Sequence, residues 1–296
     1  MLRSRLAPTP SGFLHQGNAY NFVLTWLLTR SLNGLLRLRI DDLDAPRVRE
    51  EYLDDVFFTL EWLGLDWDEG PSDVAEHRAK FSQRLRLPHY QAQLQRLRQS
   101  SDQLFACRCS RKQIQAASPD GQYPGTCRDL RLDFDAPRHA WRLRTPQGLC
   151  IQWKDTGAGP QRVDLHAAMR DPVLRRKDGL PAYQIASLTD DLDHGINCIV
   201  RGIDLRDSTA LQLHLADLLD ENRFCQARFW HHPLLLDYAG QKLSKSAGSV
   251  SLKAWRENHA DARPFYAWLS KQMGWKKPAH SAAEAMERWK ERILGG

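Results

Sequence analysis

The stretch that decides the fold lies near the N-terminus and reads Arg5-Leu6-Ala7-Pro8-Thr9-Pro10-Ser11-Gly12-Phe13-Leu14-His15-Gln16-Gly17-Asn18. Residues 2–7 predict a short strand, and the prolines and glycine of residues 8–12 predict a tight turn. Residues 19–31 are apolar enough to form a buried helix, which Gly34 is expected to end. A strand that turns and restarts as a helix presents backbone N–H groups to an anion, and His15 can donate a hydrogen bond to a phosphate. Taken alone, the pattern equally describes a structural histidine at a helix start.

Strands and helices continue to alternate beyond this start. Residues 35–40 alternate like a strand, and the apolar residues of 48–63 recur at helical spacing. A second unit combines a helix at 182–192, a strand at 196–200 and a helix at 208–222. This order predicts an α/β fold with a parallel sheet and helices on its faces.

The middle of the chain differs from both flanks. Residues 107–159 form short segments broken by glycine and proline, which indicates an insertion, and the chain from Ser251 onward is helical and mixed in charge. We therefore expect four parts: the first half of a catalytic domain (1–105), an inserted subdomain (106–160), the second half of the catalytic domain (161–250) and a small helical region (251–296).

Length and charge limit the functional classes. The 296 residues suffice for one large α/β domain with an insertion, and the net charge of +6 with a pI near 9.0 is in the direction expected of a polyanion binder. The same modest charge is equally consistent with solubility alone. No apolar run approaches the roughly 20 residues of a membrane span, and no signal-peptide core is present. We expect a cytoplasmic protein without membrane contact.

The six cysteines do not suggest a disulfide scaffold. Cys150, Cys198 and Cys225 are scattered through apolar stretches, so we expect them to be buried as small hydrophobic residues. The other three lie close together in the insertion, at Cys107, Cys109 and Cys127. Thiolates at these positions and the phenolate of Tyr123 can complete a tetrahedral zinc site, although reduced structural cysteines would leave the same pattern.

A second phosphate signal is the pentapeptide Lys242-Leu243-Ser244-Lys245-Ser246. Two lysines flanked by hydroxyls suit a polyphosphate whose charge grows in a transition state. In isolation the segment would be taken for a solvated basic loop. Together, this pentapeptide and His-x-Gly-Asn resemble, in order and spacing, the two signature motifs of class I aminoacyl-tRNA synthetases, which implies a Rossmann-type catalytic domain.

Four further segments resemble the glutamyl and glutaminyl branch of that class, in register over about residues 1–250. They are residues 5–12, residues 39–44, Asp178-Gly179-Leu180-Pro181-Ala182-Tyr183-Gln184 and Val200-Arg201-Gly202-Ile203-Asp204-Leu205. The resemblance implies that ATP, with magnesium, is bound by His15, Gly17, Asn18, Lys242, Ser244, Lys245 and Ser246. Among these, it implies catalytic roles for His15, Lys242 and Lys245. It implies glutamate contacts from Arg5, Ala7, Thr9, Asp41, Tyr183 and Arg201.

Two positions bear on the choice between glutamate and glutamine. Asp41 departs from the glutamate branch, which usually has Glu there, and the shorter side chain puts the exact contact with the amino group in doubt. Arg201 favours glutamate, because a buried guanidinium opposite a neutral amide would be left without its counter-charge. We weigh Arg201 more heavily, since it would read the group that differs between the two amino acids.

The cysteine pattern Cys107-x-Cys109, Tyr123 and Cys127 resembles the zinc element of the glutamyl-queuosine tRNA(Asp) synthetases, truncated relatives of glutamyl-tRNA synthetase. Only about 50 residues follow Ser246, which we expect to be too few for an anticodon-reading domain. The resemblance implies one structural zinc, a monomer, and transfer of glutamate to queuosine in the anticodon arm of tRNA(Asp). Two alternatives remain open: a truncated glutamyl- or glutaminyl-tRNA synthetase core that charges a tRNA 3′ end, and a non-catalytic synthetase paralogue.

Overall fold

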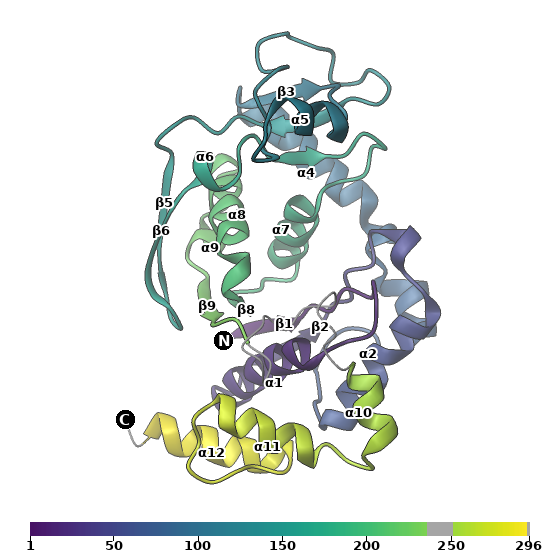
Figure 1. The fold of residues 1–296 in the computed structure, drawn as a ribbon, viewed down its shortest axis with the longest axis vertical. Helices are drawn as coiled ribbons and strands as arrows, with labels where there is room; N and C mark the ends of the chain where they lie inside the picture. Colours follow the sequence, from purple (N-terminus) through teal and green to yellow (C-terminus); the bar gives the residue numbers. More distant parts are fainter. Residues whose placement is uncertain (236–250, 295–296) are drawn as a thin grey trace. The chain divides into compact units, whose positions relative to one another are not determined.

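The computed structural model describes residues 1–235 and 251–294 (Figure 1). The chain divides into two compact units. The first unit comprises Met1–Leu85, Cys198–Ile203 and His232–Gly296, and the second comprises Arg86–Asn197 and Asp204–His231.

The first unit is built from short strands and helices drawn from both ends of the chain. They are β1 (Arg3–Leu6), α1 (Gln16–Ser31), β2 (Leu35–Leu38), η1 (Ala45–Arg47), α2 (Glu50–Leu63), α3 (Val74–Glu76), η2 (His77–Phe81), β8 (Cys198–Gly202), α10 (Leu252–Asn258), α11 (Arg263–Gln272) and α12 (Ala282–Leu294). The short helices η3 (Gln83–Arg86) and η4 (Ile203–Leu205) lie where the chain passes between the units.

Strands β1 and β2 pair in parallel, with Arg3 opposite Leu35 and Leu6 opposite Leu38, and α1 is the crossover between them. This confirms the predicted β-turn-α-β start. Helix α1 begins at Gln16, three residues before the predicted start, because His15 and Asn18 form a capping box that extends the first turn.

Gly34 lies just after α1 as expected, but the glycine is not needed there to end the helix. The left-handed residue at this helix end is Asn33, with φ of 49°, and the helix is capped at Leu32. A Cβ at Gly34 would lie 2.8 Å from both the carbonyl oxygen and the side chain of Leu2. The glycine is therefore required by the close approach of β1.

Helix α1 is buried on nearly all sides, which is why its sequence lacks a clear polar face. The C-terminal helices provide part of this cover, as Figure 1 shows. The Tyr266 hydroxyl on α11 donates to the Leu63 carbonyl at 2.5 Å, and the Trp289 indole on α12 donates to the Ser31 hydroxyl at 3.2 Å. The C-terminal region is helical, as predicted, and its buried residues also contribute to the core of this unit.

The second unit contains α4 (Leu87–Ser100), β3 (Leu104–Cys107), α5 (Arg111–Ala117), β4 (Ala140–Leu143), β5 (Cys150–Asp155), β6 (Gly159–Asp164), α6 (Leu165–Ala168), β7 (Val173–Arg175), α7 (Tyr183–Asp193), α8 (Arg206–Leu218), α9 (Asn222–Cys225) and β9 (Arg228–His232). Its first sheet has the order β3-β4-β7 and is antiparallel. Strands β5 and β6 form an antiparallel hairpin, and β5 pairs in parallel with β9. The sheets are thus mixed, not parallel throughout as predicted. The short turn of residues 156–158 joins β5 directly to β6, which an antiparallel pair allows and a parallel pair does not.

Two expectations about the scattered cysteines were wrong. Cys198 is buried on β8, as predicted, but Cys150 is half-buried and Cys225 is exposed. Cys225 is the last residue of the short helix α9, whose buried residue is Phe224. An apolar neighbourhood in sequence does not fix which face of a short helix each residue occupies.

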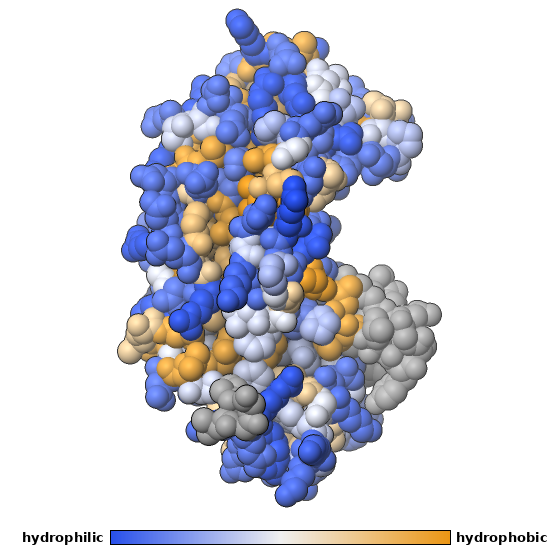
Figure 2. Space-filling view, turned by 90° about the vertical axis from the view of Figure 1, so that its left-hand side faces the viewer, coloured by the Kyte–Doolittle hydropathy of each residue, from blue (hydrophilic) through white to orange (hydrophobic). Residues whose placement is uncertain are grey.

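On the face drawn in Figure 2, hydrophilic residues cover most of the surface, and apolar residues form smaller patches between them. Within residues 1–235 and 251–294, no helix has both the length and the apolarity needed to cross a lipid bilayer.

A buried polar chain joins three elements of the second unit. The Asp155 carboxylate at the end of β5 lies 2.5 Å from Nδ1 of His231 on β9 and accepts from the His231 amide at 3.0 Å. Nε2 of His231 lies 2.9 Å from the Thr209 hydroxyl on α8. Burial alone would raise the pKa of Asp155, but hydrogen bonds from the His231 ring and from the His231 and Ala158 amides hold it below its usual range.

We expect Asp155→Asn to destabilise the protein by about 3 kcal/mol at pH 7, because it leaves a buried, charge-assisted network incomplete. A carboxyl whose folded pKa lies below its unfolded value of about 3.9 stabilises the fold above that value, and this contribution is lost as the pH falls through the folded pKa. The difference between wild type and variant should therefore shrink on acidification below about pH 4. Urea unfolding at several pH values measures it. Asp102→Asn, on an exposed turn, is the control, and an equal loss in that variant would contradict the assignment.

Candidate active site

The predicted phosphate-binding turn is held in one conformation by the cap of α1. His15 has an extended backbone, and its Nδ1 accepts the amide proton of Gly17 at 3.1 Å. The Asn18 side chain accepts the His15 amide proton at 3.0 Å. Because Nδ1 is an acceptor, the proton of the neutral imidazole resides on Nε2. The ring can therefore serve as a hydrogen-bond donor at the start of the helix.

Gly17 is required by this arrangement. A Cβ at position 17 would lie 3.0 Å from Cε1 and 3.1 Å from Nδ1 of His15, so this edge of the imidazole lies close to the glycine backbone. A larger residue would displace the ring from its amide partner. The pair His15 and Gly17 is thus one structural feature and not two independent ones.

Helix α2 and the C-terminal helix α10 hold the same turn from the other side. The buried Asp55 carboxylate accepts the Leu14 amide proton at 2.8 Å and pairs with Arg256 of α10 at 2.5 Å. The Leu14 carbonyl accepts from the Leu252 amide at 2.8 Å. His15 also forms an isolated β-bridge with Ser251. The start of α10, which follows residue 250, is therefore fixed directly to the turn that carries His15.

The second predicted phosphate segment cannot be placed in the same way. Lys242, Ser244, Lys245 and Ser246 lie outside the described residues. Their roles toward ATP stay predictions.

Two arginines predicted to hold the substrate carboxylate lie on neighbouring strands of the first unit. Arg5 on β1 is 5% exposed and Arg201 on β8 is 3% exposed. The strands are in contact, and the Ser4 hydroxyl of β1 donates to the Cys198 carbonyl of β8 at 2.8 Å. Both guanidinium groups are buried in the same unit, and a guanidinium suits a carboxylate that accepts bidentate hydrogen bonds.

Asp41 has a partner that sequence reasoning missed. Its carboxylate accepts from Nε of Arg39 at 2.7 Å and from an Nη of the same residue at 3.1 Å, and Gln83 donates to it at 3.3 Å. The Arg39–Asp41 pair is almost fully buried. The short Asp41 side chain is therefore fixed by a bidentate pair, and this orients it before any ligand arrives.

The neighbouring Asp42 is equally well held. Its carboxylate accepts from the Ser82 hydroxyl at 2.6 Å and the Gln83 amide at 2.8 Å, and lies 3.0 Å from Nε2 of the buried His77. Burial would raise the pKa of Asp42, but the hydrogen bonds from His77 and Ser82 lower it below its usual range. Asp42 thus stays ionised and anchors the segment that presents Asp41.

The remaining predicted glutamate contacts differ in exposure. Ala7 is half-buried just after β1, and Thr9 is exposed in the following turn. Tyr183 is the first residue of α7 and belongs to the second unit, where its side chain is 41% exposed. The first unit therefore holds Arg5, Ala7, Thr9, Asp41 and Arg201, and their common role toward glutamate stays a prediction.

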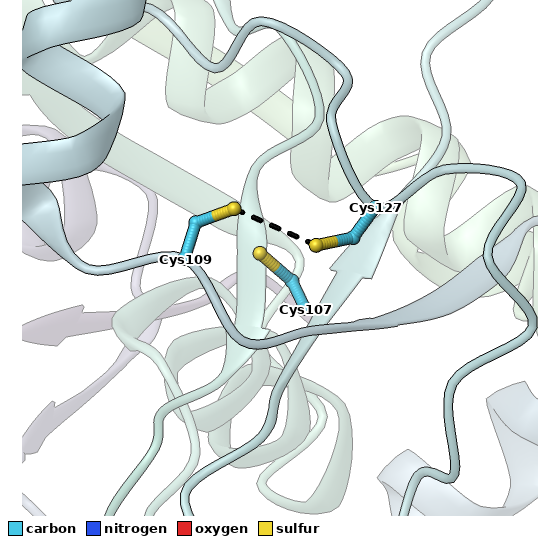
Figure 3. A group of neighbouring side chains, drawn as sticks. All are labelled: Cys107, Cys109 and Cys127. Carbon is cyan, nitrogen blue, oxygen red and sulfur yellow. Dashed lines mark hydrogen bonds between the residues drawn. The ribbon is translucent and has the colours of Figure 1, made fainter.

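The three clustered cysteines meet in space, as Figure 3 shows. The sulfur atoms of Cys107, Cys109 and Cys127 all lie within 4.8 Å of one another, and those of Cys109 and Cys127 are 3.5 Å apart. The Tyr123 hydroxyl lies 3.5 Å from the sulfur of Cys107 and accepts the Cys127 amide proton at 2.7 Å. Three cysteine sulfurs at this spacing could hold a zinc ion, and the phenolic oxygen is the candidate for the fourth position of a tetrahedral site.

The acid–base properties of the cluster fit a dication. Burial and the neighbouring thiols of Cys127 and Cys107 raise the pKa of Cys109 to about 11. Burial and the Cys107 thiol also raise the pKa of Tyr123. Burial would raise the pKa of Cys127 too, but hydrogen bonds from the Arg108 backbone and the Tyr123 side chain lower it. The Cys109 thiol and the Tyr123 phenol therefore keep their protons until a cation stabilises their anions, so metal binding would release protons.

The comparisons with known proteins agree with this geometry. Residues 1–292 match the family model for tRNA synthetases class I (E and Q), catalytic domain. The chain is 37% identical over 287 residues to the glutamyl-Q tRNA(Asp) synthetase of Nitratidesulfovibrio vulgaris, covering 93% of this chain and 87% of the relative. It is 36% identical to the glutamate–tRNA ligase of Anaeromyxobacter sp. (strain Fw109-5), of which it spans 54%.

A solved structure shows the same fold. The glutamate tRNA ligase from Elizabethkingia meningosepticum superimposes with a TM-score of 0.77 at 22% identity, over 97% of this chain and 64% of that one.

The glutamyl-Q tRNA(Asp) synthetase of Symbiobacterium thermophilum is 40% identical over 85% of this chain and 80% of its own length. The extent of these matches, together with the capped His15 turn, shows that the chain belongs to the class I aminoacyl-tRNA synthetases, a family of ligases, within its glutamate and glutamine group.

Proposed function

We propose that this protein activates L-glutamate with ATP and transfers the glutamyl group to a hydroxyl of queuosine at the wobble position of tRNA(Asp). The observation that carries the proposal is the pair of buried arginines, Arg5 and Arg201, in the unit that also carries the capped His15. A buried double cation favours an acidic side chain over a neutral amide. The choice of queuosine is supported by several relatives at 37–40% identity that are glutamyl-Q tRNA(Asp) synthetases.

The first step forms a mixed anhydride. An α-carboxylate oxygen of glutamate attacks the α-phosphorus of ATP, and the bond to the pyrophosphate oxygen breaks. Nε2–H of His15 and the amides at the start of α1 would stabilise the charge that develops on the phosphates. Lys242 and Lys245 are proposed to act on the same charge, with magnesium accompanying the ATP.

The second step is acyl transfer. A hydroxyl oxygen of the queuosine cyclopentene ring attacks the activated carbonyl carbon, AMP leaves and the hydroxyl proton is released. Arg5 and Arg201 would hold the side-chain carboxylate throughout, while Asp41, fixed by Arg39, would orient the amino group. Because the enzyme holds the reacting groups in position, the transfer step no longer depends on a bimolecular encounter.

The function is tested by transfer of labelled glutamate, with ATP, to three RNAs: tRNA(Asp) with queuosine, the same tRNA without it, and tRNA(Glu). Labelling of the first alone supports the proposal. Labelling of tRNA(Glu) would instead identify an enzyme that charges a 3′ end. If no RNA is labelled and glutamate does not stimulate ATP–pyrophosphate exchange, the proposed enzymatic activity is wrong.

Arg201→Gln should raise the KM for glutamate about 100-fold in pyrophosphate exchange, because it removes one partner of a buried ionic contact. The KM for ATP should stay within about twofold of wild type, since the change spares the His15 turn. Arg228→Gln, at an exposed position on β9, is the matched control. Equal effects on both substrates would indicate a folding defect and not a glutamate contact.

We further propose that one structural zinc is held by Cys107, Cys109, Tyr123 and Cys127. Zinc at this position would tie β3 to the loop before β4. Cys109→Ser should lower bound zinc from about one to well below one per chain and reduce Tm, whereas Cys225→Ser, outside the cluster, should do neither. Elemental analysis and thermal unfolding with and without a chelator give both readouts. Full zinc content in Cys109→Ser would exclude this ligand set.

A further inference from the structure

Arg256 links helix α10 to the phosphate-binding turn of the first unit, and the proposed reaction gives this residue no role. One Nη of its guanidinium donates to the Asp55 carboxylate on α2 at 2.5 Å. The other Nη donates to the Thr59 hydroxyl at 2.5 Å. Asp55 and Thr59 are four residues apart on α2, so they lie on the same face of that helix. The planar guanidinium contacts both, which fixes its orientation.

The carboxylate that accepts this contact is buried. Asp55 is 2% exposed, and the Arg256 side chain is 17% exposed. The second carboxylate oxygen of Asp55 accepts the Leu14 amide proton at 2.8 Å. Removal of one partner from a buried ion pair is costly, because the remaining charge is left uncompensated. Without the guanidinium, the carboxylate would turn toward water or the chain around it would move, and either change weakens the Leu14 contact.

Leu14 passes such a change on to His15. Its amide is held by Asp55, and its carbonyl accepts the Leu252 amide proton of α10 at 2.8 Å. The extended backbone of His15 continues directly from this fixed residue, and its ring accepts the Gly17 amide proton at 3.1 Å. A shift of the Leu14 backbone would therefore move the imidazole relative to the start of α1.

The position of that imidazole matters for the activation step. A donor stabilises a developing charge fully only at the correct distance, and a displacement of about 1 Å can cost about 100-fold in rate. His15 is proposed to donate from Nε2 to the phosphates of ATP. Arg256 can therefore affect the rate of this step without contact with ATP.

We infer that Arg256 is a positioning residue for the activation step, and that it acts through Asp55 and the Leu14 backbone on the His15 imidazole. The C-terminal helical region thereby provides a side chain on which the N-terminal turn depends. The inference rests on the proposed function for the reaction that His15 serves. The effect of Arg256 on the His15 ring does not depend on that reaction and can be measured without it.

Arg256→Gln tests the inference, because glutamine is neutral and lacks the guanidinium that contacts both Asp55 and Thr59. We expect kcat of glutamate-dependent ATP–pyrophosphate exchange to fall about 30-fold, with the KM for glutamate within about twofold of wild type. Arg256→Lys keeps the charge and should recover most of the loss. Tyr266→Phe is the structural control, since it removes a buried hydrogen bond between α11 and Leu63 at the far end of α2. It should lower Tm and leave kcat unchanged.

A double-mutant cycle with Asp55→Asn shows whether Arg256 acts through Asp55. If it does, the double variant should be no slower than the slower of the two single variants. Losses that multiply in the double variant would show that Arg256 acts independently of Asp55, which overturns the inference. Wild-type kcat in Arg256→Gln together with a lowered Tm also overturns it, because a purely structural contact predicts that result.

Nuclear magnetic resonance of nitrogen-labelled histidine makes the test independent of activity. The hydrogen bond at Nδ1 predicts the Nε2–H form of the His15 ring, which the ring nitrogen shifts report, and His15→Gln assigns the signals. The shifts should change in Arg256→Gln but not in Tyr266→Phe. If wild type lacks exchange and the His15 shifts still respond to Arg256→Gln, the proposed function fails and the positioning stands. Unchanged His15 shifts in Arg256→Gln overturn the positioning.

Discussion

The arrangement of the first unit depends on a single buried carboxylate. Asp55 is 2% exposed and accepts hydrogen bonds from the Leu14 backbone on one side and Arg256 on the other. A charge buried this deeply is stable only when its oxygens are fully paired, so the turn before α1 and the start of α10 must both be in place. Arg256 also donates to Thr59, one turn along from Asp55 on α2, at 2.5 Å. Segments about 240 residues apart in the chain are thereby held to one helix, and the conformation of His15 follows from that.

The same rule, that buried charge must be paired, explains how the proposed substrate site is ordered. Arg39 and Asp41 neutralise each other on the segment that follows β2, and Asp42 is satisfied by Ser82 and Gln83. These contacts fix the orientation of the Asp41 and Asp42 carboxylates. Because side-chain entropy is already lost, a ligand that contacts them need not order them again. The departure at Asp41 from the glutamate branch is thus accompanied by an arginine that holds the shorter side chain in place.

The sequence predicted the local structure correctly where hydrophobic periodicity or turn residues indicated a single type of element. The strand, turn and helix around His15, the helix at α2 and the βα order near Arg201 followed from periodicity and turn residues. Prediction from sequence was wrong where contacts with distant residues decide the outcome. Gly34 is constrained by Leu2 and does not end the helix, and the exposure of Cys225 depends on the orientation of a four-residue helix. The roles of Asp55 and Arg256 could not be read from spacing, because about 200 residues separate the partners. The cluster of three cysteines could be predicted from the sequence, since the residue type alone restricts the chemistry.

Tyr123 connects two parts of the second unit. Its hydroxyl lies 3.5 Å from the sulfur of Cys107, while the Arg142 guanidinium lies 4.0 Å from the centroid of its ring. A ligand on the hydroxyl would fix the ring plane, and the ring plane fixes the guanidinium above it. A zinc bound as proposed would therefore also orient Arg142 of β4, through one side chain. That coupling gives a physical reason for a tyrosine, in place of a fourth cysteine, in this proposed ligand set: a thiol can hold a metal, but only the phenol also presents a flat face to a guanidinium.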